Sequence, residues 1–359
     1  MTYDEVLAKL PFGVCQQDKE QLLLQGLLEL TQLHMDECLE YSRILKSFNF
    51  APNKIAHIED VPFLPVRIFK ELELMSVPCK DVFKTMTSSG TTGQKVSKIF
   101  LDRETVANQQ KTLVRIVSDF TGSERLPMLI IDCPSVLKDR AMFSARGAGI
   151  LGFSIFGRKK MYALDDDMNL RLEEVRQFIQ DHEGEKIMAF GFTFMIWQHF
   201  CKVLGKLGEC LPLENAILIH GGGWKRMVQE QVSPEEFKAA LNEVCGIGDV
   251  FNYYGMVEQT GCIYMECEEG HLHASTYSDV IMRRPKDFSV CDVGEEGIIQ
   301  VVSLLPRSYS GHSILTEDKG KIMGVDDCPC GRKGKYFRVL GRMKQAEIRG
   351  CSDTYGNNG

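Results

Sequence analysis

A candidate phosphate-binding segment is Thr87-Ser88-Ser89-Gly90-Thr91-Thr92-Gly93. Its glycines allow a tight turn and a close approach of the backbone to a ligand, and its hydroxyl groups supply donors without bulk. Backbone N–H groups exposed in such a turn attract phosphate oxygens. The segment has neither the G-x-x-x-x-G-K-[ST] order of a P-loop nor the G-x-G-x-x-G order of a dinucleotide fold. We therefore expect a phosphate-binding loop of another kind, and the alternative is a solvent-exposed Ser/Thr/Gly linker.

Cysteines supply two further candidate sites. Three thiolates and one imidazole form a tetrahedral zinc set, and the C-P-C-G stretch has a spacing typical of a metal knuckle. The alternative is a group of reduced, buried thiols, and Cys262 or His271 could replace a member of the set. Cys351, in the glycine-flanked ending, is a candidate nucleophile because nearby basic residues favour its thiolate; the alternative is an incidental exposed cysteine. The predicted zinc ligands are Cys267, His273, Cys328 and Cys330.

Hydrophobic patterning predicts the elements that position these residues. Leucines at helical spacing predict a helix over residues 17–48, and further helices are expected over 170–182 and 233–245. Apolar runs at 128–135 and 216–220 are typical of buried strands. Such alternation of strands and helices favours an α/β domain with a largely parallel sheet, and the shorter strand-like pieces after about residue 275 indicate a β-rich subdomain. Ser233 and Glu236 predict a capping box at the start of the third helix.

Composition limits the class of protein. The chain has 359 residues, 44% of them apolar and 25% charged, which excludes a disordered, collagen-like or small disulfide-framework protein. Its net charge of −7, with no run of basic residues, is a poor match to nucleic-acid binding. No stretch reaches the roughly 18 apolar residues of a spanning helix, and the N-terminus lacks the pattern of a signal peptide. We therefore expect a cytoplasmic protein with reduced thiols.

Four later motifs follow the first segment in the order found in the adenylate-forming superfamily. Gly221-Gly222-Gly223-Trp224 resembles the loop that borders the adenine and the acyl site, and Tyr254-Gly255-Met256-Val257-Glu258 resembles the Y-G-x-T-E motif. Thr316-Glu317-Asp318 resembles the T-G-D motif, and Gly341-Arg342-Met343-Lys344 resembles the hinge motif. Five ordered motifs are a far stronger signal than any one of them.

This resemblance implies that a carboxylate oxygen attacks the α-phosphate of ATP and pyrophosphate leaves. It implies ATP and Mg²⁺, with Glu258 as the Mg²⁺ ligand, Asp318 as the acceptor for the ribose hydroxyls and Tyr254 near the adenine. The alternatives are a solvated glutamate, an aspartate in a turn and an ordinary core aromatic. The implied ATP-binding residues are Thr87, Ser88, Ser89, Gly90, Thr91, Thr92, Gly93, Gly222, Gly223, Tyr254, Gly255, Asp318 and Arg342.

Three residues depart from the superfamily pattern. Val257 replaces the usual threonine, which removes one polar contact near the α-phosphate, and Glu317 replaces a glycine. Lys95 stands where the superfamily often has proline before a lysine, so the resemblance does not extend a phosphate-binding role to Lys95. The aromatic segment 188–200 is expected to be mainly core helix packing, with an acyl channel as the alternative. Gly191 and Phe192 lie where the superfamily places acyl-pocket residues.

Within the superfamily, the sequence most resembles the LuxE-type acyl-protein synthetases of the bacterial fatty-acid reductase complex. The S-S-G-T-T-G and C-P-C-G stretches and the ending Ala346–Asp353 carry this resemblance. It implies that a fatty acid is activated to acyl-AMP, transferred to Cys351 as a thioester and delivered to a reductase partner. The phenylacetate–CoA ligase family, with a similar Cys/His pattern, is next nearest. Alternative functions are an acyl- or aryl-CoA ligase, and a non-catalytic nucleotide-binding scaffold.

The motifs divide the chain into four expected segments. An N-terminal helical segment with its connection covers residues 1–84, and the α/β adenylating core covers 85–275. A β-rich subdomain follows over 276–340, and the hinge-like motif with a short tail covers 341–359. The hinge-like motif lies close to the last residue, so we expect the usual mobile C-terminal domain, with its catalytic lysine, to be reduced to this tail.

Overall fold

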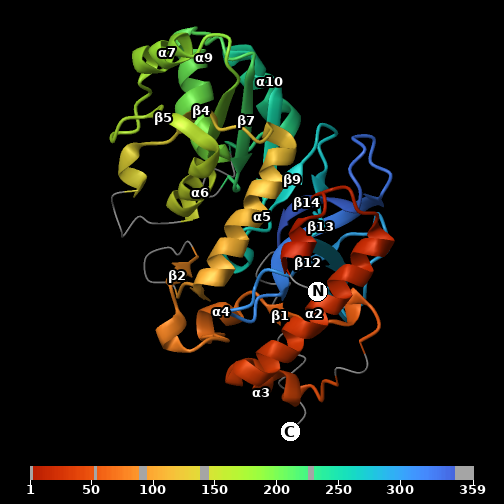
Figure 1. The fold of residues 1–359 in the computed structure, drawn as a ribbon. Helices are drawn as coiled ribbons and strands as arrows, with labels where there is room; N and C mark the ends of the chain where they lie inside the picture. The colour runs from red at the N-terminus through yellow and green to blue at the C-terminus, as the bar shows by residue number, and fades with distance from the viewer. Residues whose placement is uncertain (1–2, 52–54, 89–94, 138–144, 225–229, 344–359) are drawn as a thin grey trace. The chain divides into compact units, whose positions relative to one another are not determined.

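The computed structural model describes residues 3–51, 55–88, 95–137, 145–224 and 230–343, and Figure 1 shows its ribbon. Contacts divide the chain into two compact units. The first, discontinuous unit comprises Met1–Ile116 and Gly255–Gly359, and the second comprises Val117–Tyr254. This partition differs from the four consecutive segments expected from the motifs, because the first unit combines the two ends of the chain.

The second unit contains a parallel sheet in the order β8-β7-β6-β4-β5. Its central strands are buried along their whole length, as is typical of parallel strands with helices on both faces. Its strands are β4 (Leu126–Ile131), β5 (Gly157–Tyr162), β6 (Ile187–Phe192), β7 (Ala216–Gly221) and β8 (Asp249–Tyr254). Its α-helices are α6 (Ala145–Phe153), α7 (Leu172–Asp181), α8 (Thr193–Ile196), α9 (Lys202–Leu207) and α10 (Pro234–Cys245).

The predictions for this unit are largely confirmed. The strands predicted at 128–135 and 216–220 correspond to β4 and β7, and the helices predicted at 170–182 and 233–245 correspond to α7 and α10. Ser233 forms the expected capping box: its hydroxyl accepts from the Glu236 N–H at 3.1 Å, and the Glu236 carboxylate accepts from the Ser233 N–H at 2.8 Å. The prediction that segment 188–200 is mainly a core helix is wrong for its start, because Met188–Phe192 belong to β6. Burial on both sheet faces makes such a strand as continuously apolar as a core helix.

The first unit contains an antiparallel sheet in the order β11-β12-β13-β14-β10-β9, and β1 pairs with β13 in parallel. β12 is one of the short strands expected after about residue 275. The strands are β1 (Leu64–Pro65), β9 (Tyr264–Glu266), β10 (Leu272–His273), β11 (Ser278–Arg283), β12 (Gly297–Ser303), β13 (Ser313–Val325) and β14 (Lys335–Arg342). A separate hairpin consists of β2 (Lys84–Thr87) and β3 (Lys98–Leu101).

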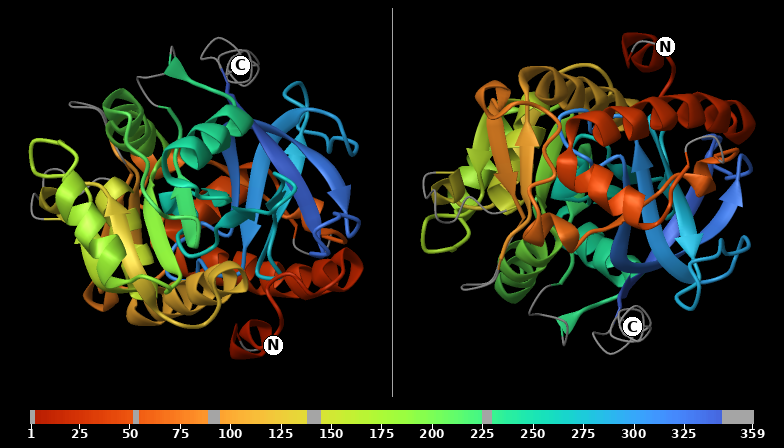
Figure 2. Two further views of the ribbon diagram at one scale, coloured as in Figure 1. Left: turned by 90° about the horizontal axis from the view of Figure 1, so that it is seen from above. Right: turned by 90° about the horizontal axis from the view of Figure 1, so that it is seen from below.

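Helices of the N-terminal segment cover the strands of this first unit, as the right-hand view of Figure 2 shows for α2, drawn in red. The predicted helix 17–48 is interrupted at Cys38, where an extended backbone separates α2 from α3. Four leucines of α2 are buried, at positions 22, 23, 27 and 30. The α-helices are α1 (Tyr3–Leu7), α2 (Gln16–Glu37), α3 (Leu39–Ser47) and α4 (Ile68–Glu71), and α5 (Arg103–Thr121) contains the boundary between the units. The α/β fold with a largely parallel sheet and an additional β-rich part is confirmed.

Candidate active site

The predicted phosphate-binding segment begins at the end of the β2–β3 hairpin. Thr87 lies opposite Lys98, and beyond this pair the Ser88 N–H donates to the Ser97 carbonyl at 3.2 Å. The Ser97 N–H in turn donates to the Ser88 hydroxyl at 2.9 Å. These bonds join Ser88 and Ser97, which flank residues 89–94 in the sequence. Ser89, Gly90, Thr91, Thr92 and Gly93 themselves lie outside the described residues.

Glu258 lies in the same unit, in the short 3₁₀ turn η9 (Val257–Gln259), and is 5% exposed. The Tyr309 hydroxyl donates to the Glu258 carbonyl at 2.8 Å, and the Gln259 amide donates to the Gly311 carbonyl at 2.9 Å. Burial raises the pKa of the Glu258 carboxyl, and the neighbouring Ser97 side chain opposes part of this shift. The predicted Mg²⁺ ligand therefore adjoins Ser97, which is hydrogen-bonded to Ser88 of the predicted phosphate-binding segment.

Asp318 lies within β13, so the alternative of an aspartate in a turn is wrong. Its N–H donates to the Thr316 hydroxyl at 3.1 Å, and Arg342 lies directly opposite it on β14. The distance from Arg342 Nε to Asp318 Oδ1 is 3.7 Å. The structure thus brings together two of the predicted ATP-binding residues. Lys95, for which the resemblance implied no role, is exposed and ion-paired with Glu71.

The predicted adenine and acyl residues meet in the second unit, at the carboxyl ends of β6 and β7. Gly191 pairs with His220, and Phe192 pairs with Gly221. Gly222 has a φ of +78°, and a Cβ on it would lie 2.9 Å from the Phe192 ring. Only glycine therefore fits at position 222 without displacing that ring.

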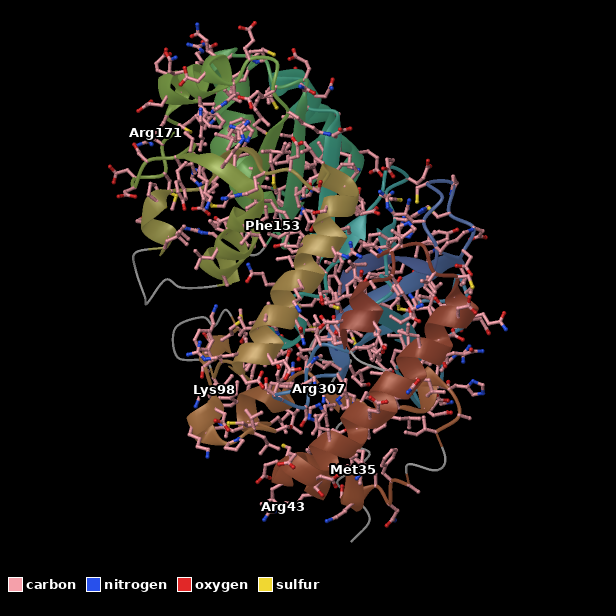
Figure 3. The ribbon with its side chains drawn as sticks, in the orientation of Figure 1. Met35, Arg43, Lys98, Phe153, Arg171 and Arg307 are labelled. Carbon is pink, nitrogen blue, oxygen red and sulfur yellow. The ribbon has the colours of Figure 1, made fainter. Side chains whose placement is uncertain are left out.

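The aromatic residues around Phe192 are closely packed. Phe153, labelled in Figure 3, stacks on Phe190 with ring centroids 4.3 Å apart and contacts Tyr253 at 5.1 Å. Tyr254, the last residue of β8, is half-buried, and Gly255 is the first residue of the other unit. The predicted ATP-binding residues are thus distributed over both units.

Sequence reasoning missed two polar pairs at the carboxyl edge of the parallel sheet, where open α/β sheets bind ligands. Asp132, immediately after β4, is fully buried, and its Oδ2 lies 3.0 Å from Nε of Arg146. Thr193 and His220 are linked by a 2.9 Å hydrogen bond, and burial lowers the pKa of His220 to about 3. A charged residue directly after a buried strand was the signal available for Asp132.

The four predicted zinc ligands converge in the first unit. The candidate ligand atoms of Cys267, His273, Cys328 and Cys330 all lie within 4.8 Å of one another. Sγ of Cys267 and Sγ of Cys328 are 3.9 Å apart, and Sγ of Cys330 is 3.4 Å from Nε2 of His273. Burial raises the pKa of Cys328 to about 12 and lowers that of His273 to about 4. The imidazole is therefore neutral at physiological pH, which is the form that coordinates zinc.

His271, the alternative ligand, also lies nearby, with Nδ1 3.6 Å from Sγ of Cys328. Cys262 instead accepts a hydrogen bond from the Ser303 hydroxyl at 3.3 Å. The set Cys267, His273, Cys328 and Cys330 therefore remains the better candidate. Cys351 lies outside the described residues.

Comparisons with known proteins identify the fold and the family of the chain. A 2-hydroxyisobutyryl-CoA ligase, solved with 2-hydroxyisobutyryl-AMP and CoA, superposes with a TM-score of 0.70 and 16% identity, covering 90% of this chain and 69% of that chain. Long-chain-fatty-acid–luciferin-component ligases are similar in sequence. The one from Aliivibrio fischeri is 20% identical over 84% of this chain and 79% of its own length, and the one from Vibrio harveyi is 20% identical over 94% and 88%.

The fold is therefore that of the adenylate-forming ligases. The family described as acyl-protein synthetase, LuxE, matches residues 2–358, and the chain belongs to this family. The predictions of the family and of a ligase are confirmed. Among the described helices, none is both long and apolar enough to cross a membrane.

Proposed function

We propose that the protein activates a fatty acid with ATP and then acylates its own Cys351. The carboxylate oxygen attacks the α-phosphate, which forms acyl-AMP and releases pyrophosphate. The Cys351 thiolate then attacks the acyl carbonyl, which forms a thioester and releases AMP. The observation that carries this proposal is the buried Glu258 carboxylate beside Ser97, at the base of the serine/threonine/glycine segment.

In this proposal, the predicted site residues have separate roles in binding the nucleotide, the metal ion and the acyl group. Segment 87–93 and Arg342 bind phosphates, Asp318 accepts from the ribose hydroxyls, and Tyr254, Gly222, Gly223 and Gly255 border the nucleotide. Glu258 fits a Mg²⁺ ion because a carboxylate oxygen is the kind of ligand that such a hard cation prefers. The ion, when bound, neutralises the charge that develops on the phosphates. Gly191 and Phe192 contribute to the acyl site.

The acyl-enzyme is proposed to pass its acyl group to a reductase partner in the cytoplasm. The names of the related fatty-acid–luciferin-component ligases support a long-chain fatty acid as the substrate and a place in luminescence or another aldehyde-forming reaction. A second candidate is an acyl-CoA ligase, because the superposed solved enzyme is a CoA ligase. The two candidates share the first step and differ in the thiol that accepts the acyl group.

One experiment distinguishes self-acylation from acyl-CoA formation. Purified protein is incubated with radiolabelled fatty acid, ATP and Mg²⁺, with and without CoA, and both ATP–pyrophosphate exchange and protein-bound label are measured. We expect exchange and a hydroxylamine-labile label without CoA, and a Cys351→Ala variant that keeps the exchange but loses the label. The matched control is Cys79→Ser, an exposed cysteine. Label on Cys351→Ala, or acyl-CoA as the sole product, would rule out self-acylation.

We also propose a structural zinc ion held by Cys267, His273, Cys328 and Cys330. Three thiols and a neutral imidazole within 4.8 Å match the donors that zinc prefers. The Nδ1 atom of His273 is buried without a hydrogen-bond partner, and Nε2, on the other side of the ring, lies 3.4 Å from Sγ of Cys330. All four ligands come from protein side chains, which is typical of a structural and not a catalytic centre.

A further inference from the structure

Glu317, which stands where the superfamily has glycine, is in contact with two arginines. Its side chain is 18% exposed, and its Oε1 accepts from Nε of Arg67. Its Oε2 lies 3.5 Å from a terminal nitrogen of Arg342, which is 74% exposed. The half-buried carboxylate of Glu317 thus lies between Arg67 and Arg342, one of the predicted ATP-binding residues.

Strand register produces this arrangement. In the parallel pair, Leu64 lies opposite Ile314 and Pro65 opposite Leu315, so Arg67 arrives beside Glu317. On the other side of β13, the Met343 N–H donates to the Glu317 carbonyl at 2.9 Å. The Met343 bond holds the backbone of Glu317 on the β14 side, and its side chain contacts Arg67 on the β1 side.

Arg342 is shared between two carboxylates. Its Nε is 3.7 Å from Asp318, and a terminal nitrogen is 3.5 Å from Glu317. An exposed arginine that lost Glu317 would turn fully to Asp318 and occupy the oxygens that the ribose hydroxyls need. Exposed ion pairs are weak and easily rearranged, so a second carboxylate is enough to change this balance.

We propose that Glu317, held by Arg67, is a positioning residue for nucleotide binding. It keeps Arg342 away from full pairing with Asp318, so that Asp318 remains an acceptor for the ribose and Arg342 remains available to the phosphates. This inference rests on the proposed function, since it requires ATP at Asp318. It goes further by assigning a role to a residue that the family resemblance marks only as a departure.

The test is ATP–pyrophosphate exchange by the full-length protein and its Glu317→Gln variant. We expect the KM for ATP to rise about fivefold, the size of a weak ion-pair effect, with kcat and the KM for the fatty acid nearly unchanged. Glu317→Asp, which keeps the charge, should restore part of the affinity. Arg67→Met should raise the same KM, and the double variant should not add to it, because both residues act through one contact.

The control is Glu295→Gln, which likewise removes a carboxylate from an arginine, Arg284, in the same unit; its side chain is 36% exposed. An unchanged KM for ATP in Glu317→Gln, with an active wild-type protein, overturns this inference alone. Equal losses in both KM values and in kcat overturn it as well, because they indicate general damage to the fold. A wild-type protein without exchange activity overturns the proposed function and this inference together.

Discussion

At the scale of single residues, Glu258 has two features that destabilise a fold: a buried carboxylate and no basic residue to pair with it among the described residues. Its carboxylate is almost fully buried, and burial raises its pKa. No arginine or lysine lies within ion-pair distance of it among the described residues. A carboxylate kept in such a place is typical of a functional site, where a bound cation and phosphates supply the compensating interactions.

The first prediction concerns Glu258→Gln. A raised pKa in the folded state means that the folded protein binds more protons than the unfolded chain, so stability is lost as pH rises from about 4.3 through the raised pKa. At pH 7 the neutral variant should therefore unfold at a higher temperature than the wild type, and the difference should vanish near pH 4. Its ATP–pyrophosphate exchange should nevertheless fall by about 10²–10³, as for other preorganised charge-stabilising groups.

Thermal unfolding at pH 7 and pH 4 and exchange assays on the same samples measure these two effects. Glu295→Gln, a surface carboxylate, is the control and should change neither quantity appreciably. A Glu258→Gln variant that is less stable than the wild type at pH 7 and equally active would contradict both the assigned role and the electrostatic argument.

At the scale of elements, the candidate zinc centre connects two parts of the antiparallel sheet. Cys267 and His273 lie in the β9–β10 hairpin, where the Cys267 N–H donates to the His271 carbonyl at 2.8 Å. Cys328 and Cys330 lie in the connection between β13 and β14, and β10 pairs with β14. A short two-residue strand such as β10 gains little from its own ladder, so a metal would supply much of its stability.

The second prediction is one zinc ion per chain, measured by elemental analysis of the purified protein. Cys330→Ser should lose the metal and destabilise the protein by about 3–4 kcal/mol where free zinc exceeds its Kd by ~100- to 1,000-fold. Cys79→Ser, with an exposed thiol in the same unit, should keep both. Wild-type protein that is metal-free after expression in zinc-supplemented medium, with unchanged stability on adding zinc, would exclude the centre.

At the scale of the whole molecule, sequence patterns predicted the long-range contacts less well than they predicted single helices and strands. The Ser233–Glu236 capping box and the C-P-C-G knuckle depend on neighbouring residues, so their spacing is visible in the sequence. The pairing of β1 with β13 joins residues 250 positions apart and leaves no periodicity to detect. For the same reason the sequence did not indicate that the two ends of the chain form one unit, nor that Glu317 lies beside Arg67.

A buried ion-pair network joins those two ends. Nζ of Lys19 on α2 lies 3.3 Å from Oδ1 of Asp279 on β11, and both side chains are at most 1% exposed. Lys335 lies 3.1 Å from the other oxygen of Asp279, and the Gln16 amide donates to that oxygen at 2.7 Å. Burial acts to raise the pKa of Asp279, but the charges of Lys19 and Lys335 outweigh it and hold the pKa below its ordinary value.

The third prediction is that Lys19→Met destabilises the protein by about 3 kcal/mol in urea unfolding, because it removes one of two cations from a fully buried carboxylate. Lys111→Met, which removes an exposed pair with Asp4, should cost less than about 1 kcal/mol. Adding Asp279→Asn to Lys19→Met should recover part of the loss, since the remaining cation, Lys335, still has Glu20 and Glu59 at 3.8 and 3.7 Å. Equal effects of Lys19→Met and Lys111→Met would show that α2 is held to the sheet by its buried leucines and not by this network.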